Sequence, residues 1–209
     1  MRRLFPSMVQ SISYSEEEII HDILELHSPA GIIDLDPTYG KGGIYRGTNL
    51  PRPRLRFDLK PRSKQVTQAD VTDLPREEGS VGCTLFDPPF IITGMKESSG
   101  MTHARFGSFT SWEDLCAMYH RALKELYRIT QPQGIVIFKC QDTVNGRYQH
   151  FSHVAVMQLA CRVGWYPKDL FIFMKKNRPT REYQTQNHAR KHHSYFWVFQ
   201  KSNRTAHYV

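Results

Sequence analysis

The stretch that decides the fold reads Val81-Gly82-Cys83-Thr84-Leu85-Phe86-Asp87-Pro88-Pro89-Phe90. Its first six residues form an almost continuous apolar run and predict a buried strand. An acid, two prolines and an aromatic residue follow, and because the prolines fix φ, residues 87–90 form a rigid, shallow platform. A carboxylate on such a platform can accept hydrogen bonds from an exocyclic amine while the aromatic side chain stacks on the ring that carries the amine. The stretch therefore indicates a ligand with a planar, amino-bearing ring.

Helical and strand patterns alternate along the rest of the chain. Apolar stripes at helical spacing predict three helices, which cover residues 16–28, 111–129 and 150–163. Short apolar runs predict strands at residues 31–36, 55–58, 65–71, 81–86, 134–138, 170–174 and 195–199. Nearly continuously apolar strands that alternate with helices are typical of a parallel sheet covered on both faces. We therefore predict one α/β domain over residues 1–209, with a mostly parallel central sheet flanked by helices.

Local signals refine the first half of this prediction. Ser15 is placed to cap the first helix, Glu18 is at the reciprocal position of a capping box, and Pro29 stops the helix. Between residues 58 and 65 the chain is too short for a helical crossover, which usually takes about a dozen residues. Residues 41–53 offer at most a turn or two of helix. We therefore expect the early half of the sheet to be abridged, with connectors too short for crossover helices, unless one of its strands has been assigned to the wrong residues.

Composition sets the broad class of the protein. The 209 residues carry a formal net charge of +8 and are 40% hydrophobic, so a packed core and a polyanionic partner both fit. The four cysteines are widely spaced without a C-x-x-C pair, which argues against a disulfide framework and a zinc knuckle and suits a reducing compartment. No long uncharged apolar stretch exists, and no secretory apolar core follows Met1-Arg2-Arg3. We expect a soluble cytoplasmic protein that binds no membrane.

Four of the predicted strands end in an acidic residue, at Asp36, Asp58, Asp70 and Asp87. In an open α/β sheet, ligands bind beyond the carboxyl ends of the strands. A row of carboxylates there suits a ligand with hydroxyls, an amino group and adenine, and disfavours a pyrophosphate. The loop at residues 36–43, Asp-Pro-Thr-Tyr-Gly-Lys-Gly-Gly, also lacks the spacing of a P-loop or a dinucleotide fingerprint. The predicted ligand is a nucleoside with a zwitterionic tail.

Five stretches, in order over most of the chain, resemble the S-adenosylmethionine-dependent amino-methyltransferases that include the N6-adenine and N4-cytosine DNA methylases. Residues 36–42 are similar to the first motif of that family, and residues 87–90 are similar to its catalytic (D/N/S)-P-P-(Y/F/W) motif. Residues 69–75 resemble the family's segment that carries the acid after the third strand. Residues 123–134 resemble its stretch between the catalytic strand and the next strand, and residues 193–199 resemble its last strand. The modified first loop and the short connectors resemble small phage or prophage types.

The resemblance implies a Rossmann-like methyltransferase fold with S-adenosyl-L-methionine as the cofactor. It assigns cofactor binding to Asp36, Thr38, Gly40, Gly42, Asp58, Asp70 and Asp87. The two glycines would let the backbone approach the methionine part of the cofactor. Asp36 would lie near its ammonium group, Asp58 near its ribose hydroxyls and Asp70 near its adenine amino group.

The resemblance also implies the catalytic residues, which are Asp87, Pro88, Pro89 and Phe90. Asp87 and the Pro88 carbonyl would accept hydrogen bonds from the target amine, and Phe90 would stack on the base, which must leave its helix to be reached. The lone pair of such an amine is delocalised into the ring. Holding both N–H bonds favours a pyramidal nitrogen whose lone pair faces the methyl sulfonium, and alignment then supplies much of the rate.

The expected target is N6 of adenine in DNA, a choice that rests on family frequency. N4 of cytosine, RNA as the substrate, and a nucleic-acid-binding protein that keeps the fold without turnover remain alternatives. Nucleic-acid contacts are assigned to the basic residues Arg105, Lys175, Lys176, Arg178, Arg181, Arg190 and Lys191. The loop at residues 91–110 is interpreted as a lid or substrate clamp. Because the motifs occupy nearly the whole chain, we expect a short or relaxed target sequence, or an added partner subunit.

Other reactive side chains have simpler interpretations. Cys140 with the following glutamine resembles the Pro-Cys-Gln of cytosine C5 methylases, but Lys139 replaces the proline, so we interpret Cys140 as a strand-end residue. Three histidines at positions 188, 192 and 193 have no cysteine or carboxylate placed to complete a ligand set, and we predict no metal site. Lys139 and Asp142 are assigned only a role in shaping the pocket.

Overall fold

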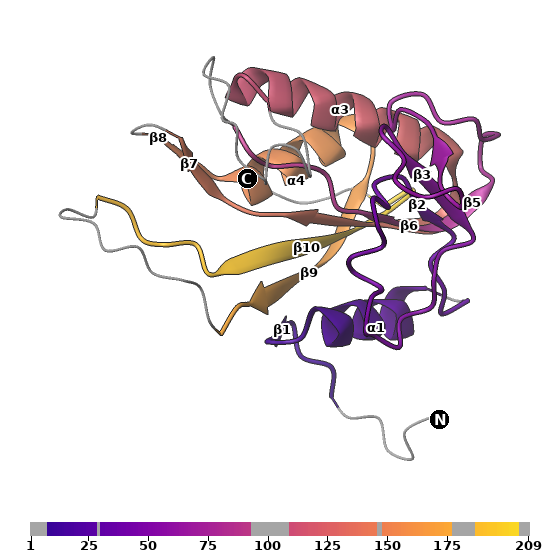
Figure 1. Cartoon of the computed structure of the whole chain (residues 1–209), viewed down its shortest axis with the longest axis horizontal. Helices are drawn as coiled ribbons and strands as arrows, with labels where there is room; N and C mark the ends of the chain where they lie inside the picture. Colours follow the sequence, from indigo (N-terminus) through magenta and orange to yellow (C-terminus); the bar gives the residue numbers. More distant parts are fainter. Residues whose placement is uncertain (1–7, 29, 93–108, 146–147, 177–186, 205–209) are drawn as a thin grey trace.

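In a computed structural model, the protein is built around an eight-stranded sheet with helices on both faces (Figure 1). The structure describes residues 8–28, 30–92, 109–145, 148–176 and 187–204. The strands of the sheet are β1 (Ile12–Ser13), β2 (Leu35–Asp36), β3 (Leu55–Asp58), β4 (Thr67–Gln68), β5 (Val81–Phe86), β6 (Thr130–Cys140), β9 (Tyr166–Met174) and β10 (His193–Gln200). The helices and the separate hairpin are α1 (Glu16–His27), α3 (Trp112–Ile129), α4 (Ser152–Val163), β7 (Thr143–Asn145) and β8 (Tyr148–His150).

The order of strands across the sheet is β1-β9-β10-β6-β5-β2-β3-β4. The five strands from β6 to β4 are parallel neighbours. β10 is antiparallel to both β6 and β9, and β1 is parallel to β9. Among the described strands of this sheet, only β10 runs against the others. The predicted α/β class, with a mostly parallel sheet flanked by helices, is confirmed.

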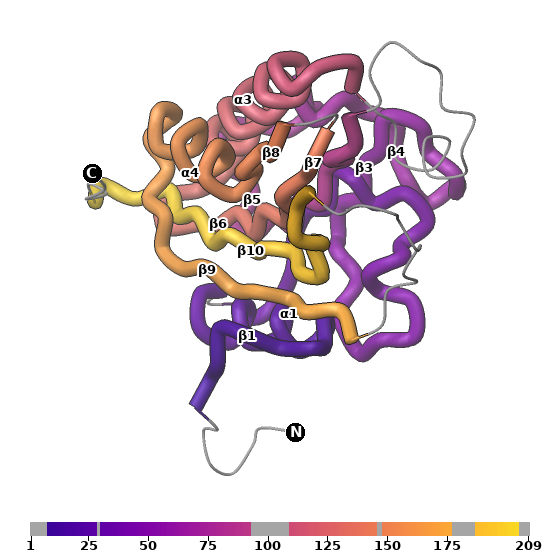
Figure 2. Tube along the Cα trace, turned by 90° about the vertical axis from the view of Figure 1, so that its left-hand side faces the viewer, coloured from indigo at the N-terminus to yellow at the C-terminus, as the bar shows by residue number. Residues whose placement is uncertain are grey.

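The sheet separates two hydrophobic cores. Helices α3 and α4 cover one face and α1 covers the other, as the two views at right angles show (Figures 1 and 2). The side chains of β6 alternate between the two faces of the sheet. Val136 and Phe138 pack in the core beneath α3 and α4, and Ile135 and Ile137 pack in the core beneath α1. Side chains alternate across a strand, and burying each large apolar one stabilises the fold by about 1.5–3 kcal/mol. This explains why the central strands are apolar at nearly every position.

The first helix begins as predicted, with one difference at its cap. The Ser15 hydroxyl accepts a hydrogen bond from the Glu18 backbone amide at 3.2 Å. The reciprocal half of the capping box was predicted wrongly, because the Glu18 carboxylate accepts from the Ser13 hydroxyl at 2.6 Å. The Ser15 amide donates to Ser13 Oγ at 2.9 Å instead. The short strand before the helix thus supplies the partner that the local pattern did not reveal.

The early half of the sheet is abridged, as predicted. β2 and β4 have two residues each, fewer than the predicted ranges of 31–36 and 65–71, and residues 40–47 form a run of turns without a helix. On the α1 face, the place of a crossover helix is taken by Tyr39, Tyr45 and Leu50, all buried in the core there. The rings of Tyr39 and Tyr45 stack with centroids 5.4 Å apart. Aromatic residues of a loop therefore cover this part of the sheet.

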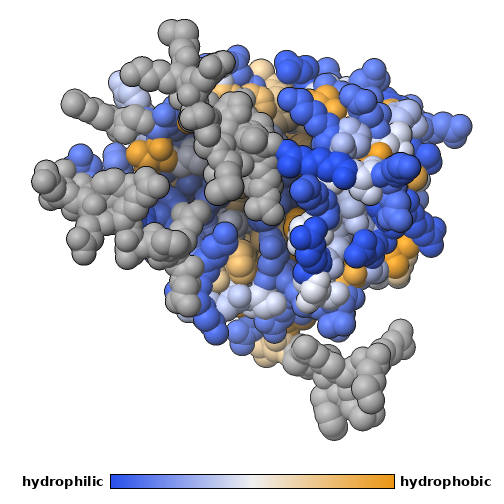
Figure 3. Space-filling model, viewed as in Figure 1, coloured by the Kyte–Doolittle hydropathy of each residue, from blue (hydrophilic) through white to orange (hydrophobic). Residues whose placement is uncertain are grey.

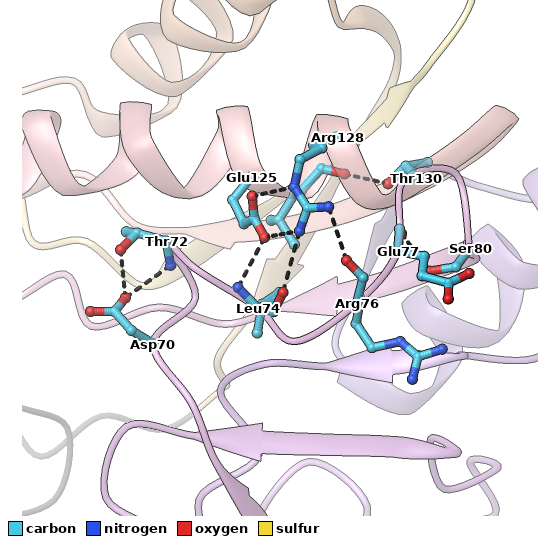
Figure 4. A network of polar contacts seen from close by, with 10 residues as sticks. Asp70, Thr72, Leu74, Arg76, Glu77, Ser80, Glu125, Arg128 and Thr130 are labelled. Carbon is cyan, nitrogen blue, oxygen red and sulfur yellow. Dashed lines mark hydrogen bonds and ion pairs between the residues drawn. The ribbon is translucent and has the colours of Figure 1, made fainter.

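On the opposite face, side chains of α3 hold the connector between β4 and β5 (Figure 4). Glu125 Oε1 accepts from the Leu74 amide at 2.9 Å, and the Arg128 guanidinium donates to the carbonyls of Leu74 at 3.3 Å and Arg76 at 2.9 Å. Glu125 and Arg128 also pair with each other. A backbone that lacks a helix of its own must satisfy its polar groups elsewhere, and α3 provides those partners.

The later strands extend beyond their predicted ranges. β6 begins at Thr130 and β9 at Tyr166, each four residues before the predicted start, and the pairing of β5 with β6 shifts register between Val81 and Cys83. Gln133 in β6 has a φ of 65°, in the left-handed region, where a glutamine gives no sequence signal. Strand β1 and the β7–β8 hairpin were not predicted, because each has only two or three residues.

Hydrophilic residues predominate on the face seen in Figure 3, and apolar residues are scattered among them in small groups. None of the helices in the described ranges has the length and apolar character needed to cross a membrane.

Candidate active site

The predicted strand-end acids meet at one edge of the sheet. β2 lies between β5 and β3, and all three strands are parallel, so that their carboxyl ends are adjacent. Asp36 ends β2, Asp58 ends β3, and Asp87 directly follows β5. The strand that carries Asp58 is present as predicted, which places Asp58 at this edge. A ligand bound beyond these strand ends would lie at an edge where three neighbouring strands each lead into an acidic residue.

Asp36 lies beneath the loop that follows it. It is 2% exposed, and its Oδ1 accepts from the Thr38 amide at 2.8 Å and the Thr38 hydroxyl at 3.2 Å, while its Oδ2 accepts from the Tyr45 hydroxyl at 2.9 Å. Burial raises the pKa of Asp36 to about 7, against these hydrogen bonds, and the nearby charge of Asp87 adds to the rise. Asp36 therefore organises the loop from inside, a role that the sequence did not reveal.

Thr38 joins this loop to the Asp-Pro-Pro-Phe platform. Its hydroxyl donates to Asp36 Oδ1 and accepts from the Asp87 backbone amide at 3.0 Å. The hydrogen bond spans 49 positions of sequence and fixes the start of the platform against the loop. The two strongest motifs of the sequence are thus physically connected through one side chain.

Two glycines shape the same loop. Gly40 and Gly42 have φ values of 55° and 67°, a region that side chains rarely adopt. The Gly40 amide donates to Asp58 Oδ2 at 2.8 Å, and Asp58 Oδ1 accepts from the Lys60 amide at 2.8 Å. A Cβ at position 42 would lie 2.7 Å from the Tyr39 hydroxyl oxygen. Position 42 therefore favours glycine for two reasons: its φ is positive, and a side chain there would collide with the Tyr39 ring.

Asp70 stands apart from the other acids. It lies two residues after β4, is exposed, and its Oδ1 accepts from the amide and the hydroxyl of Thr72, both at 2.9 Å (Figure 4). These contacts repeat the Asp36–Thr38 pattern, but near the surface. The structure places Asp70 beyond the next strand from Asp58, at the outer end of the same row.

The platform at residues 87–90 is held by one side chain from the loop after β2 and one from α3. Pro88 is buried, while Asp87, Pro89 and Phe90 are partly exposed. The Tyr119 hydroxyl of α3 donates to the Pro89 carbonyl at 3.2 Å. Thr38 holds the first residue of the platform and Tyr119 holds the third, so the positions of the acceptors are fixed.

Lys139 pairs with the Asp87 carboxylate from the neighbouring strand. Lys139 Nζ donates to Asp87 Oδ2 at 3.1 Å and lies 2.6 Å from Glu16 Oε1, at the start of α1. Burial raises the pKa of Asp87 against the opposing effect of Lys139, and Glu16 adds to the rise. Burial lowers the pKa of Lys139, but the two carboxylates outweigh it, and the net pKa is above its usual value. Sequence reasoning gave Lys139 a general role and missed Glu16.

A second polar cluster lies just beyond the end of β6. Asp142 Oδ1 lies 2.7 Å from His153 Nδ1, the His153 ring stacks on Tyr195 at 4.2 Å, and the Tyr195 hydroxyl lies 2.9 Å from His193 Nε2. Burial opposes ionisation of Asp142, but the hydrogen bonds and charge of His153 outweigh it and lower the pKa of Asp142. Among the described residues, no group of three or more His, Cys, Asp or Glu side chains could hold a metal ion.

Cys140 is the last residue of β6, as predicted for a strand-end cysteine, and its side chain is fully buried. Burial raises the pKa of its thiol well above the usual value, with the charge of Asp142 as a further cause. A thiol in this state supplies no thiolate nucleophile near neutral pH.

Some of the predicted nucleic-acid contacts lie together near the end of β9. Lys175 and Lys176 are exposed; the Lys175 amide donates to the His192 carbonyl at 2.8 Å, and the Lys176 ammonium lies 5.0 Å from the centre of the Tyr14 ring. The segment 190–191 precedes β10, which pairs with β9. The remaining predictions, at Arg105, Arg178 and Arg181 and for most of the loop 91–110, lie outside the described residues.

No protein-family model matches the sequence, and no curated protein matches it either. Solved structures do match. A candidate DNA modification methylase from Thermus thermophilus is 17% identical, over 68% of this chain and 54% of that one, with a TM-score of 0.48. The cytosine-N4-specific PvuII DNA methyltransferase is 12% identical, over 66% of this chain and 49% of that one, with a TM-score of 0.49.

A third similar structure is a complex of the Haloferax volcanii Trm112 methyltransferase activator with a candidate methyltransferase. It is 13% identical, over 82% of this chain and 82% of that one, with a TM-score of 0.48. The present chain thus spans about half the length of the first two proteins. At these identities and scores, the similarities do not identify the substrate of this chain.

Proposed function

We propose that the protein transfers a methyl group from S-adenosyl-L-methionine to the exocyclic amine of a DNA base, most readily N6 of adenine. One observation carries the proposal. The Asp87-Pro88-Pro89-Phe90 platform follows a central parallel strand, and its first amide is bonded to Thr38, in the loop after the neighbouring strand. A site for an amine-bearing ring and a glycine-containing loop thus share one edge of the sheet.

The residues at this edge fit the cofactor by their chemistry. S-adenosyl-L-methionine supplies an activated methyl group on a positively charged sulfonium, and it carries an ammonium group and a ribose diol. The edge presents Asp58 and Asp87 as carboxylates, and Gly42 leaves no side chain in the loop. Asp58 would accept from the ribose hydroxyls and Asp70 from the adenine amino group. Asp36 would act near the ammonium group through the loop that it holds, since it is 2% exposed.

The platform residues hold and orient the target amine. Asp87 and the Pro88 carbonyl accept its two N–H bonds, and Phe90 stacks on the ring. Thr38 and Tyr119 keep these acceptors in place through their bonds to Asp87 and Pro89. Held in this way, the nitrogen presents its lone pair to the methyl group, and alignment of the two reactants lowers the barrier.

DNA as the substrate rests on the formal charge of +8 and on the basic residues near the end of β9. Contacts of lysine and arginine with phosphates give affinity without sequence preference, so a short target sequence or a partner subunit for recognition belongs to this proposal. N4 of cytosine and RNA present the same kind of amine and are the competing substrates.

Radiolabelled methyl transfer to unmethylated DNA and to RNA tests the proposal, with Asp87→Ala and Asp87→Asn as variants. We expect incorporation into DNA by the wild-type protein and a loss of at least about a hundredfold in both variants. Sequencing the methylated product identifies the base. Equal incorporation by wild type and Asp87→Ala would refute the catalytic assignment, and transfer to RNA alone would refute DNA as the substrate.

A further inference from the structure

Resting on the proposed function, a further role can be assigned to two residues outside the motif. We propose that Lys139 and Glu16 are positioning residues for Asp87: the Lys139 ammonium, itself held by Glu16, fixes Asp87 Oδ2 and leaves Oδ1 for the target amine. We call these three residues the Glu16–Lys139–Asp87 triad. It is built from the start of α1, the end of β6 and the residue after β5.

The geometry of the triad is that of one cation between two anions. Lys139 Nζ lies 3.1 Å from Asp87 Oδ2 and 2.6 Å from Glu16 Oε1. The exposed fractions of the side chains are 14% for Lys139, 21% for Asp87 and 28% for Glu16. The ammonium also lies 5.8 Å from the centre of the Phe196 ring, which belongs to the neighbouring strand β10. An ammonium this poorly hydrated requires both partners, because an unpaired buried charge is strongly destabilising.

The triad divides the two oxygens of the Asp87 carboxylate between two tasks. Oδ2 accepts from Lys139, so the plane of the carboxylate cannot turn freely. Oδ1 has no such fixed partner among the described hydrogen bonds and remains available as an acceptor. A target amine that must be aligned within a few tenths of an ångström gains from an acceptor whose orientation is already set.

The triad also sets the charge at the site. Methyl transfer forms an N–C bond and breaks an S–C bond; the sulfonium becomes a neutral thioether, and the amine nitrogen becomes positive until it loses a proton to solvent. The triad has a formal charge of −1 and stabilises this positive nitrogen. The ionisable groups facing Asp87 are Lys139 from β6, Glu16 from α1, Lys175 after β9, Asp36 from β2 and Tyr119 from α3.

The two partners act on Asp87 with opposite signs. Lys139 favours the ionised carboxylate, and Glu16 disfavours it. Removing the cation must therefore raise the pKa of Asp87, and removing the charge of Glu16 must lower it. Residues whose charges do not act on Asp87 would give no such pair of opposite shifts, and the effect on kcat against KM then tests whether this action positions Asp87.

The experiment is an NMR titration of the Asp87 side-chain carboxyl carbon, assigned with Asp87→Asn, in wild type, Lys139→Met and Glu16→Gln. We expect the apparent pKa to rise by about one unit in Lys139→Met and to fall by several tenths in Glu16→Gln. Glu17→Gln is the matched control. It removes the same charge from the first turn of α1, but the Glu17 carboxylate accepts from the Asn49 amide at 2.7 Å.

Kinetics complete the test. In Lys139→Met we expect kcat to fall about tenfold or more, with the KM for cofactor changed less than about threefold, and Lys139→Arg to restore part of the loss. Unshifted titrations in both variants would overturn the proposal, and if Lys139→Met fails to fold, Glu16→Gln still decides it. A wild-type protein that methylates no nucleic acid would refute the proposed function, while the titration would still decide the triad.

Discussion

Asp36 offers the sharpest test of how the loop is built. The carboxyl is 2% exposed, and its burial raises its pKa from the usual 3.8 to about 7. We consider Asp36→Asn, which keeps an acceptor for the amide and hydroxyl of Thr38 and removes the charge. The amide nitrogen of the new side chain can donate to the Tyr45 hydroxyl, so the hydrogen bonds of the site can be retained.

The sign and size of the effect follow from proton linkage. Between pH 3.8 and about 7 the folded protein binds a proton at Asp36 that the unfolded chain has lost, so the free energy of unfolding falls as pH rises. At about 1.4 kcal/mol per pH unit, the full window corresponds to about 4 kcal/mol. The stabilising contribution is complete below pH 3.8 and is lost above about pH 7.

Urea unfolding followed by tryptophan fluorescence measures this effect, since Trp165 is 2% exposed and reports on the core. We expect the stability of wild type relative to Asp36→Asn to fall by about 4 kcal/mol between about pH 4 and pH 7.5. Asp70→Asn is the matched control, because Asp70 makes the same two contacts with Thr72 near the surface. A wild-type advantage that stays constant with pH would refute the assignment of a buried, protonated Asp36.

Two further substitutions test the loop and the connector. Gly42→Ala places a Cβ 2.7 Å from the Tyr39 hydroxyl at a φ of 67°, and we expect a loss of about 1–3 kcal/mol in stability together with weaker cofactor binding. Thermal unfolding with and without S-adenosyl-L-methionine measures both, and an unchanged melting temperature would contradict the crowding. Arg128→Ala removes the bonds to the Leu74 and Arg76 carbonyls, and we expect a loss of about 1 kcal/mol, modest because the side chain is 40% exposed. Hydrogen exchange should accelerate in residues 70–80; equal protection in the variant would show that α3 does not hold this connector.

The sequence predicted best where one strong pattern acted alone. The strand before the Asp-Pro-Pro-Phe platform was predicted at residues 81–86 and is observed as Val81–Phe86, and α3 ends at Ile129 as predicted. Each has an apolar pattern that fits only one kind of element. Each is also bounded by a local signal: two prolines follow shortly after the strand, and a capping serine precedes the helix. Local chemistry was sufficient in these cases.

Prediction failed where a partner distant in sequence decides the outcome. Lys139 and Glu16 are separated by 123 positions, the difference between their residue numbers, and only the packing of α1 beside β6 brings them together. The signal for Lys139 was present, since a lysine at the end of the neighbouring strand must lie close to Asp87. The signal for Glu16 was not, because an acid in the first turn of a helix is explained by the helix itself.

The abridged half of the sheet gives these long-range contacts their importance. This part of the chain has no crossover helix, and the buried Asp36 holds the loop after β2. Thr38 is bonded to Asp36 and also accepts a hydrogen bond from the Asp87 amide, which connects the platform to this loop. Lys139 holds the other end of Asp87, its carboxylate. The acceptor of the proposed reaction is therefore fixed at both its backbone and its side chain by groups from different strands. A loop that contains no helix can still present a rigid site, provided that its polar groups are bonded to the elements that flank it.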